Sequence, residues 1–211
     1  MKIAIFLPSL HGGGAEHMML NLAEGFIERG HEVTFVLRKA EGPYMACVPD
    51  GASVIDLGFS GEKARASFFG RIAQRLHLTP PLMFIPLGLI VLKLAWVLRT
   101  ERPDAVLSAM TMTNVTALLA RRISRVPCRL VISERNSPSM NWTKDGKGRR
   151  RIQSHGARWT YPWADGITAV TEGVADDLCA LTGLPKERVR VIYNPTITKE
   201  LAWQPSSPVA V

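Results

Sequence analysis

Short apolar segments alternate with stretches of helical periodicity along all 211 residues, and this alternation restricts the fold more than any other feature of the chain. The apolar segments are rich in β-branched residues, as expected of buried strands. They comprise residues 2–7, 31–37, 52–57, 103–110, 128–134, 166–171 and 188–194. Strands separated by helices form βαβ units, whose strands are parallel and whose helices cover both faces of the sheet. Because such connections are almost always right-handed, the sequence predicts an α/β fold with a Rossmann-like doubly wound parallel sheet.

The composition fits one globular domain in a reducing compartment. Hydrophobic residues make up 46% of the chain and charged residues 21%, which is enough apolar material for one core. The three cysteines lie far apart without a C-x-x-C pair, so we expect neither a disulfide framework nor a metal site. The apolar run before Pro8 is too short for a signal peptide. We therefore expect a cytoplasmic protein.

Three loops that follow predicted strands carry unusual residues. They read PSLHGGGAE after the first strand, ERNSPS after the strand at 128–134, and NPT after the last strand. In doubly wound sheets, ligands bind beyond the carboxyl ends of the strands. We therefore expect the function to reside in these loops.

The glycine loop has the properties of an anion site. Gly12, Gly13 and Gly14 have no side chains, so their backbone N–H groups can approach a ligand closely, and the helix that follows offers further unpaired donors. The dinucleotide pattern G-x-G-x-x-G fails because its last position, counted from Gly12, is His17. No P-loop pattern is present either. The plainer alternative is a tight turn between strand and helix without a ligand.

The order and spacing of the motifs resemble family 4 glycosyltransferases, of the bacterial type that builds surface polysaccharides and lipid-linked glycans. Gly13, Gly14 and Glu16 match the G-G-x-E loop of that family. Further matches follow along the chain: GHEV at the helix exit, SERN after the strand at 128–134, ADGITAVTEGVADDL, and VRVIYNP. Together these segments span residues 2–195.

The resemblance implies one half of a GT-B architecture. We expect residues 1–195 to form the N-terminal Rossmann-like domain on the acceptor side, and residues 196–211 to begin an interdomain linker, with the C-terminal donor-binding domain absent. The family transfers a sugar from UDP-sugar or GDP-sugar to an acceptor hydroxyl with retention of configuration and without a metal or other cofactor. We expect the 211-residue chain alone to be inactive. The alternative is a non-catalytic half-domain that binds an acceptor or a partner.

The resemblance also assigns a role to the loop residues. Gly12, Gly13 and Gly14 would approach the donor diphosphate and stabilise the charge of the leaving group. Glu16 would orient the loop, or would only be a favourable acid in the first turn of the helix. His11 is a catalytic candidate for proton transfer, against the alternative of a hydrogen-bonded surface histidine.

The loops after the later strands supply the remaining candidates. Glu134 is the second catalytic candidate, and Arg135 and Asn136 would hold the acceptor or the sugar; a solvated loop is the alternative. The other substrate-binding candidates are Thr171 and Glu172, which open the next helix, and Asn194 after the last strand. For Thr171, a plain helix cap is an equal alternative.

The net charge of +8 suggests an anionic surface as a partner. Between Arg121 and Arg158 the chain has eleven Lys or Arg and two acids, including the run KDGKGRRR at 144–151, which is typical of a mobile solvated loop. The basic amphipathic segment 64–85 suits attachment to lipid headgroups, whereas the apolar run 82–97 is shorter than the about 20 residues of a membrane span. We expect peripheral association with the inner face of the cell membrane and no nucleic-acid partner, because no nucleic-acid-binding motif is present.

Overall fold

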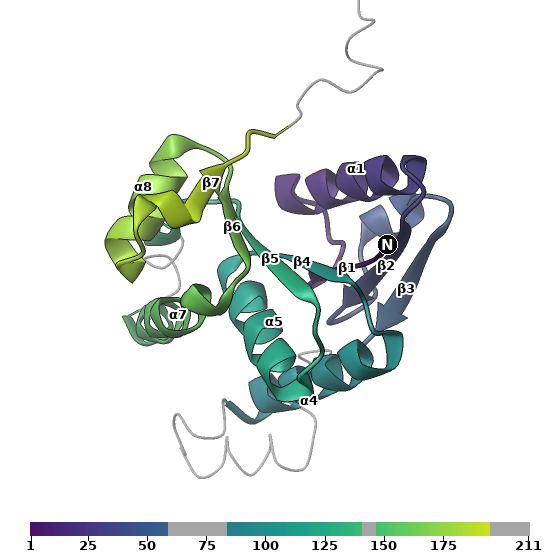
Figure 1. Ribbon diagram of the computed structural model, residues 1–211, viewed down its shortest axis with the longest axis horizontal. Coiled ribbons are helices and arrows are strands. Elements are labelled where there is room, and N and C mark those ends of the chain that lie inside the picture. The colour runs from purple at the N-terminus through teal and green to yellow at the C-terminus, as the bar shows by residue number, and fades with distance from the viewer. Residues whose placement is uncertain (59–83, 141–146, 195–211) are drawn as a thin grey trace, which may run out of the picture.

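The computed structural model describes residues 1–58, 84–140 and 147–194 (Figure 1). Within these ranges lie seven strands: β1 (Lys2–Leu7), β2 (Glu32–Leu37), β3 (Ala52–Asp56), β4 (Ala105–Ala109), β5 (Arg129–Glu134), β6 (Gly166–Ala169) and β7 (Val189–Val191). Every pair of neighbouring strands is parallel. The predicted α/β fold with a parallel sheet is confirmed, with strand bounds within a few residues of those expected.

The strand order is β3-β2-β1-β4-β5-β6-β7, so the sheet grows in one direction from β1 and in the other from β4. The chain therefore continues from β1 to β2 on one side of the central pair and from β4 to β5 on the other side. In doubly wound sheets, this reversal opens a crevice at the carboxyl ends of the two central strands. The predicted glycine loop follows β1 and lies at this switch point.

Helices cover both faces of the sheet (Figure 1). One face carries α1 (Gly14–Glu28) and the short 3-10 helix η1 (Pro43–Cys47); the other carries α4 (Phe84–Glu101), α5 (Thr111–Ser124), α7 (Lys147–Thr160) and α8 (Glu172–Thr182). Two further 3-10 turns are η3 (Tyr161–Trp163) and η4 (Lys186–Arg188). This division follows from right-handed crossovers, because strands added on opposite sides of the switch place their helices on opposite faces.

Two hydrophobic cores sit on the two faces of β1. Ile5 and Leu7 pack towards α1, together with Met19, while Phe6 packs towards α4 and α5. Every residue of β1 after Lys2 is buried. A strand buried on both faces has an uninterrupted apolar sequence rather than an alternating one, which is why KIAIFL is so readily identified.

One prediction about the basic segment is wrong. Residues 147–151 were expected in a solvated loop, but they form the first turns of α7. Arginine and lysine are good helix formers, so a basic run continues a helix without difficulty. Residues 144–146 lie outside the described residues, as do nearly all of the amphipathic segment 64–85 and the expected linker from 196 onwards.

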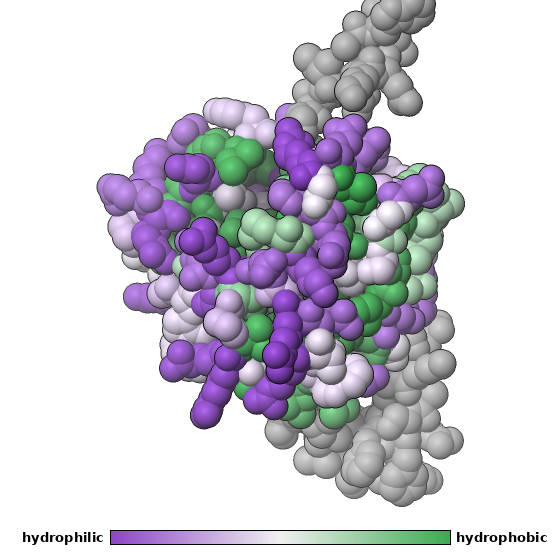
Figure 2. Space-filling model, turned by 45° about the vertical axis from the view of Figure 1, so that its right-hand side comes forward, coloured by the Kyte–Doolittle hydropathy of each residue, from purple (hydrophilic) through white to green (hydrophobic). Residues whose placement is uncertain are grey.

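No helix in the described ranges is long and apolar enough to cross a bilayer. Hydrophilic side chains predominate on the face shown in Figure 2, and hydrophobic ones appear between them. Several large apolar side chains are nevertheless exposed, and those on α4 are considered below.

Candidate functional site

The carboxyl edge of the sheet brings the main predicted loops together. The register pairs Phe6 of β1 with Ser108 of β4, and Ala109 of β4 with Ser133 of β5. Because neighbouring strands lie about 4.8 Å apart, the glycine loop and the loop after Glu134 emerge about 10 Å apart, on either side of the β4–α5 turn. Thr171 and Glu172 follow β6, one strand further along, and Asn194 follows the edge strand β7.

The glycine loop is tied to the segment after β2. Leu10 N donates to Glu41 O at 2.9 Å, and Tyr44 N donates to Leu10 O at 3.1 Å. Gly42 makes this tether possible: its φ is +115°, and a Cβ at this position would lie 2.1 Å from Leu10 O. Sequence reasoning missed Gly42, although the dipeptide Gly42–Pro43 is a recognisable turn signal.

The three positions of the loop differ in how strongly the backbone and its surroundings require a glycine. Gly12 has a φ of +103°, a conformation that favours glycine, whereas Gly13 is extended and precedes α1 as its N-cap. A Cβ on Gly14 would meet nothing within 4 Å. The fold of the described chain therefore does not need a glycine at position 14, which leaves room for a ligand.

Glu16 lies close to the loop that it was predicted to orient. Its Oε2 is 2.6 Å from where a Cβ on Gly13 would be, so the carboxylate folds back over the N-cap. An acid in the first turn also stabilises the helix dipole, and the geometry suits both interpretations. The orienting role of Glu16 stays a prediction.

The turn between β4 and α5 is strained and lies at the switch point. Met110 has φ 74° and ψ 139°, which is rare for a residue with a side chain, and its N–H donates to Ser133 O at 3.2 Å. Such a conformation costs about 1–3 kcal/mol and is most often found at functional sites. Sequence reasoning missed this turn, because a positive φ at methionine has no signature in the sequence.

Neither α1 nor α5 has a side-chain cap at its N-terminus. The first N–H groups of a helix have no partner within the helix, and the positive end of the helix dipole lies there. Both termini lie at the carboxyl edge of the sheet, after the neighbouring strands β1 and β4. This arrangement suits a ligand with more than one negative charge, such as a diphosphate.

Below this turn lies a buried polar network around Glu134, whose side chain is 2% exposed. Its carboxylate accepts hydrogen bonds from the Tyr161 hydroxyl, from Thr111 Oγ1 at 3.2 Å and from Asn114 Nδ2 at 3.3 Å. Burial raises the pKa of Glu134 to about 7, although these hydrogen bonds act in the opposite direction. A carboxyl group with a pKa near neutrality is suited to acid–base chemistry.

Asn114 joins this network to the sheet. Its Oδ1 accepts from Ser108 Oγ at 2.7 Å, and its Nδ2 donates to Ser133 O at 3.1 Å. Asn114 is fully buried. The network links β4, β5, α5 and η3, and through Glu134 it holds Thr111 at the start of α5. Sequence reasoning missed the roles of Asn114 and Tyr161.

Arg135 follows Glu134 and has unsatisfied donors. Its Nε and Nη2 atoms are buried, and neither has a hydrogen-bond partner among the residues that the structure describes. Burial lowers the pKa of Arg135, because the charged guanidinium is removed from water. Leaving a buried charged donor unpaired is costly, so this side chain is suited to an anionic or strongly polar ligand. The neighbouring Asn136 is exposed.

The other predicted residues are engaged in local interactions or exposed. His11 Nε2 lies 3.1 Å from Glu41 Oε1 on the exposed side of the loop. Thr171 Oγ1 accepts from Val174 N at 3.2 Å, so the helix-cap alternative is confirmed for this residue. Glu172 forms an exposed ion pair with Lys186 at 3.4 Å. Asn194 is exposed after β7.

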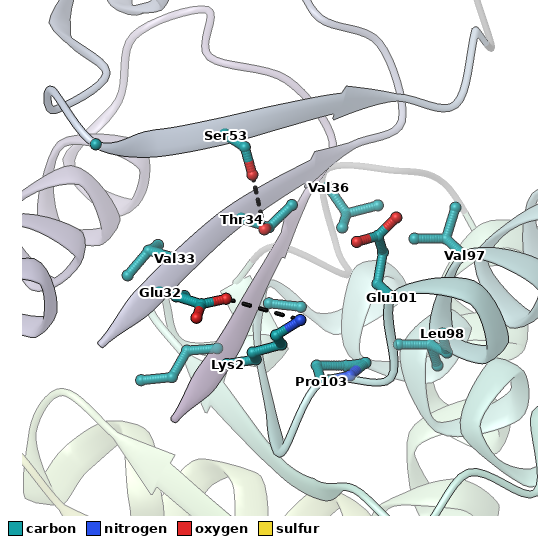
Figure 3. A pocket seen from close by; sticks show the side chains of 13 residues that line it. Lys2, Glu32, Val33, Thr34, Val36, Ser53, Val97, Leu98, Glu101 and Pro103 are labelled. Carbon is teal, nitrogen blue, oxygen red and sulfur yellow. Dashed lines mark hydrogen bonds and ion pairs between the residues drawn. The ribbon is translucent and has the colours of Figure 1, made fainter. Parts of the chain in front are cut away.

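Two cavities lie at the opposite, amino-terminal edge of the sheet. One, of about 280 Å³, is bordered by the start of β1 and β2 and the end of α4; Figure 3 shows Lys2 paired with Glu32 there, 3.8 Å apart, and Glu101 nearby. The other, of about 520 Å³, lies between the ends of α4 and α5. Ligands of such sheets bind at the carboxyl ends of the strands, so neither cavity competes for the main site.

Comparison with known proteins identifies the family to which this chain belongs. The family model described as "Glycosyl transferase 4-like domain" matches residues 13–195. The chain belongs to the glycosyl transferase 4-like domain family. This confirms the resemblance drawn from the glycine loop, the SERN segment and the VIYNP segment. No curated protein matches the chain.

Solved structures show that this glycosyltransferase-like domain shares the fold of GT-B enzymes. A lipopolysaccharide outer core galactosyltransferase, WaaB, is 19% identical over 93% of this chain and 46% of its own, with a TM-score of 0.63. Anabaena HepE in complex with UDP-glucose is 19% identical over 92% of this chain and 44% of its own (TM-score 0.59). UDP-GlcNAc 2-epimerase from Methanocaldococcus jannaschii is 15% identical over 92% and 46% (TM-score 0.53). The chain spans less than half the length of each of these three proteins.

Proposed function

We propose that this domain forms the acceptor-side half of a retaining glycosyltransferase, which moves a sugar from UDP-sugar or GDP-sugar to an acceptor hydroxyl. The observation that carries the proposal is the pair of uncapped helix N-termini at the switch point, one behind Gly13 and one behind the strained Met110. Transfer of the sugar leaves a nucleoside diphosphate with additional negative charge. Backbone donors fixed in advance at this point stabilise that charge without reorganisation.

The relatives support a nucleotide-sugar as the donor. HepE was crystallised with UDP-glucose, and UDP-GlcNAc is the substrate named for the epimerases of similar fold. WaaB is named for a step in the lipopolysaccharide outer core, which supports a surface polysaccharide or a lipid-linked glycan as the product class. The proposal includes no metal ion and no organic cofactor.

The residues of the site take complementary parts. Gly12–Gly14 and the start of α5 face the diphosphate, and the unpaired guanidinium of Arg135 with Asn136 holds the acceptor or the sugar. Glu134 holds Thr111 at the start of α5, and its carboxyl group, with a pKa near neutrality, is the first group for proton transfer. His11, on the exposed side of the loop, is the second group for proton transfer.

A second candidate function is a non-catalytic half-domain that binds an acceptor or a partner, which is favoured by the burial of Glu134, one of the two catalytic candidates. Sequencing the coding DNA past codon 211 separates the two. An in-frame continuation with paired glutamates at E-x7-E spacing supports the two-domain transferase, in which the present chain alone is inactive. A stop codon directly after Val211 supports the binding half-domain.

Gly14→Ala tests the site in the active polypeptide that contains this domain. The new methyl group has free space in the domain itself, so it interferes only with a bound ligand. We expect kcat/KM for sugar transfer to fall about a hundredfold, as for a misplacement of about 1 Å at a reacting centre. The matched control is Gly173→Ala in the first turn of α8, where a Cβ also meets nothing within 4 Å. Equal activity of both variants would contradict the proposed site.

A further inference from the structure

Three neighbouring helices on one face of the sheet, α4, α5 and α7, form a basic layer. By sequence, α4, α5 and α7 contain a single acid, Glu101, and these basic residues: Lys93, Arg99, Arg121, Arg122, Lys147, Arg149, Arg150, Arg151 and Arg158. In contrast, α1 and α8 contain no Lys or Arg and these acids: Glu16, Glu24, Glu28, Glu172, Asp176 and Asp177. The acidic helix α8 lies on the same face of the sheet, beside α7, so the positive charge is confined to the three neighbouring helices α4, α5 and α7. A charge separated in this way suits an extended anionic surface.

The same layer has an exposed apolar stripe. Leu89, Leu92 and Trp96 are 48%, 56% and 65% exposed, and their spacing places them on the outer face of α4. The inner face of the helix is buried in the core through residues such as Leu94 and Leu98. Single exposed apolar residues are common, but a stripe that ends in a large aromatic side chain marks an interaction surface.

An arginine-lined pocket continues this stripe at the carboxyl ends of α4 and α5. It has a volume of about 520 Å³ and is lined by Arg99, Arg102 and Arg125, together with Asp104 and Ser124. Arg99 lies in the seam between the two helices, where its Nε donates to Ser124 O at 3.0 Å. Asp104 is engaged with the backbone of Lys2, whose N–H donates to it at 2.7 Å.

Two of these arginines are held at a conformational cost. Arg102 and Arg125 have φ values of +47° and +56°, in the left-handed region where a helix usually ends in glycine. Within the described residues, neither guanidinium forms a hydrogen bond or ion pair. Cations at helix ends also neutralise the helix dipole, but that effect does not require a left-handed arginine or an adjoining apolar stripe.

We propose that the outer face of α4 and the arginine pocket together form a docking surface for an anionic lipid bilayer, with a lipid phosphate in the pocket. The apolar side chains enter the boundary between headgroups and acyl chains, and the arginines contact the phosphates. Nucleic acid would make no use of Leu89 and Leu92, and a second copy of the chain would bring a like-charged layer against this one. The lipid surface is the only one of the three that matches both properties.

The docking surface also has a consequence for the acceptor, and this consequence alone rests on the proposed function. Because α4 leads into β4 and runs antiparallel to it, the stripe extends along the length of the strands. The carboxyl edge with the glycine loop then opens sideways along the membrane rather than towards it or away from it. A lipid-linked acceptor can reach such an opening without leaving the bilayer.

Vesicle co-sedimentation of the full chain tests the proposal. We compare vesicles of phosphatidylcholine with vesicles of phosphatidylcholine and phosphatidylglycerol, at low and high salt. The wild-type chain should bind the anionic vesicles and should bind less at high salt. Arg102→Gly with Arg125→Gly should lower partitioning about 25-fold, since each arginine near an anionic surface contributes about fivefold. Glycine suits both left-handed positions, so this variant should fold with a melting temperature at least that of the wild type.

A second variant tests the apolar stripe. Leu92→Ser with Trp96→Ser should also lower partitioning, but with the salt dependence retained. The matched controls are Arg190→Gln on β7 and Val54→Ser on β3, an exposed cation and an exposed apolar residue away from the layer, and both should bind as the wild type does. Gly14→Ala should also bind vesicles normally, so a failure of the proposed function does not affect this test.

Five outcomes would overturn the docking surface. The wild-type chain does not sediment with anionic vesicles, or the variants sediment as well as the wild type. Inorganic phosphate binds to the arginine pocket but vesicles do not, which would make it a site for a soluble anion. Serine at 92 and 96 converts a dimer to a monomer, which would make the stripe an interface between copies. RNA binds and competes with vesicles while the serine variant binds RNA normally, which would assign the layer to nucleic acid.

Discussion

Glu134 follows a strand at the edge where a substrate would bind, yet its carboxyl group faces inwards and is almost fully buried. The sequence correctly predicted its position in the chain at the end of β5. Its direction was not predictable, because Asn114 and Tyr161 are distant in the sequence and their contacts with Glu134 exist only after folding. The same holds for the strain at Met110 and for the tether at Gly42.

The buried carboxyl should give the domain a specific pH dependence of stability. The pKa of Glu134 is about 7 in the folded chain, whereas the ordinary value of a glutamate, which applies to the unfolded chain, is 4.5. Between these values the unfolded chain loses the proton first, so the free energy of unfolding should fall as pH rises from 4.5 to 7 and then level off. The difference in pKa corresponds to a loss on the order of 3 kcal/mol.

Glu134→Gln isolates this contribution, because glutamine does not ionise. Urea unfolding of the variant at a series of pH values should lack the fall that the wild type shows over this range. Glu24→Gln on the exposed side of α1 is the control and should keep the fall. An identical pH profile for wild type and Glu134→Gln would show that the carboxyl is not sealed from water.

At the scale of elements, strands were the most predictable part of this chain. Buried parallel strands have a nearly continuous apolar sequence, and β1 was predicted with the bounds that it has in the structure. The start of α7 was mispredicted because a basic sequence is compatible with both a solvated loop and an exposed helix. The helix η1 was missed because its five residues are too few to show periodicity.

Arg125, the left-handed residue that ends α5, should lower the free energy of unfolding relative to a glycine at the same position. Arg125→Gly should raise the free energy of unfolding by about 1 kcal/mol, because the left-handed conformation is unfavourable for arginine and not for glycine. The urea midpoint should rise with an unchanged m value. Arg122→Gly, inside the same helix, should instead lower stability by about 1 kcal/mol. A loss of stability in Arg125→Gly would mean that its guanidinium makes a stabilising contact.

At the scale of the whole molecule, the candidate ligand site and the proposed docking surface lie in different places. The carboxyl edge holds the glycine loop, the Met110 turn and Arg135, whereas the arginine pocket lies at the amino-terminal edge. The sequence predicted the net charge and a basic region between Arg121 and Arg158. It did not predict that α4 shares this basic layer, because which helices are neighbours follows from the strand order.

The central claim is that a nucleotide diphosphate binds at the switch point of this glycosyltransferase-like domain. Titration of the ¹⁵N-labelled chain with UDP, followed through the backbone amide resonances, tests it most directly. We predict that the amides of Gly13, Gly14 and Thr111 shift together, while those of Lys2, Thr34 and Glu101 at the opposite edge do not. Shifts confined to that opposite edge, or no shifts at the glycine loop under saturating UDP, would contradict the claim.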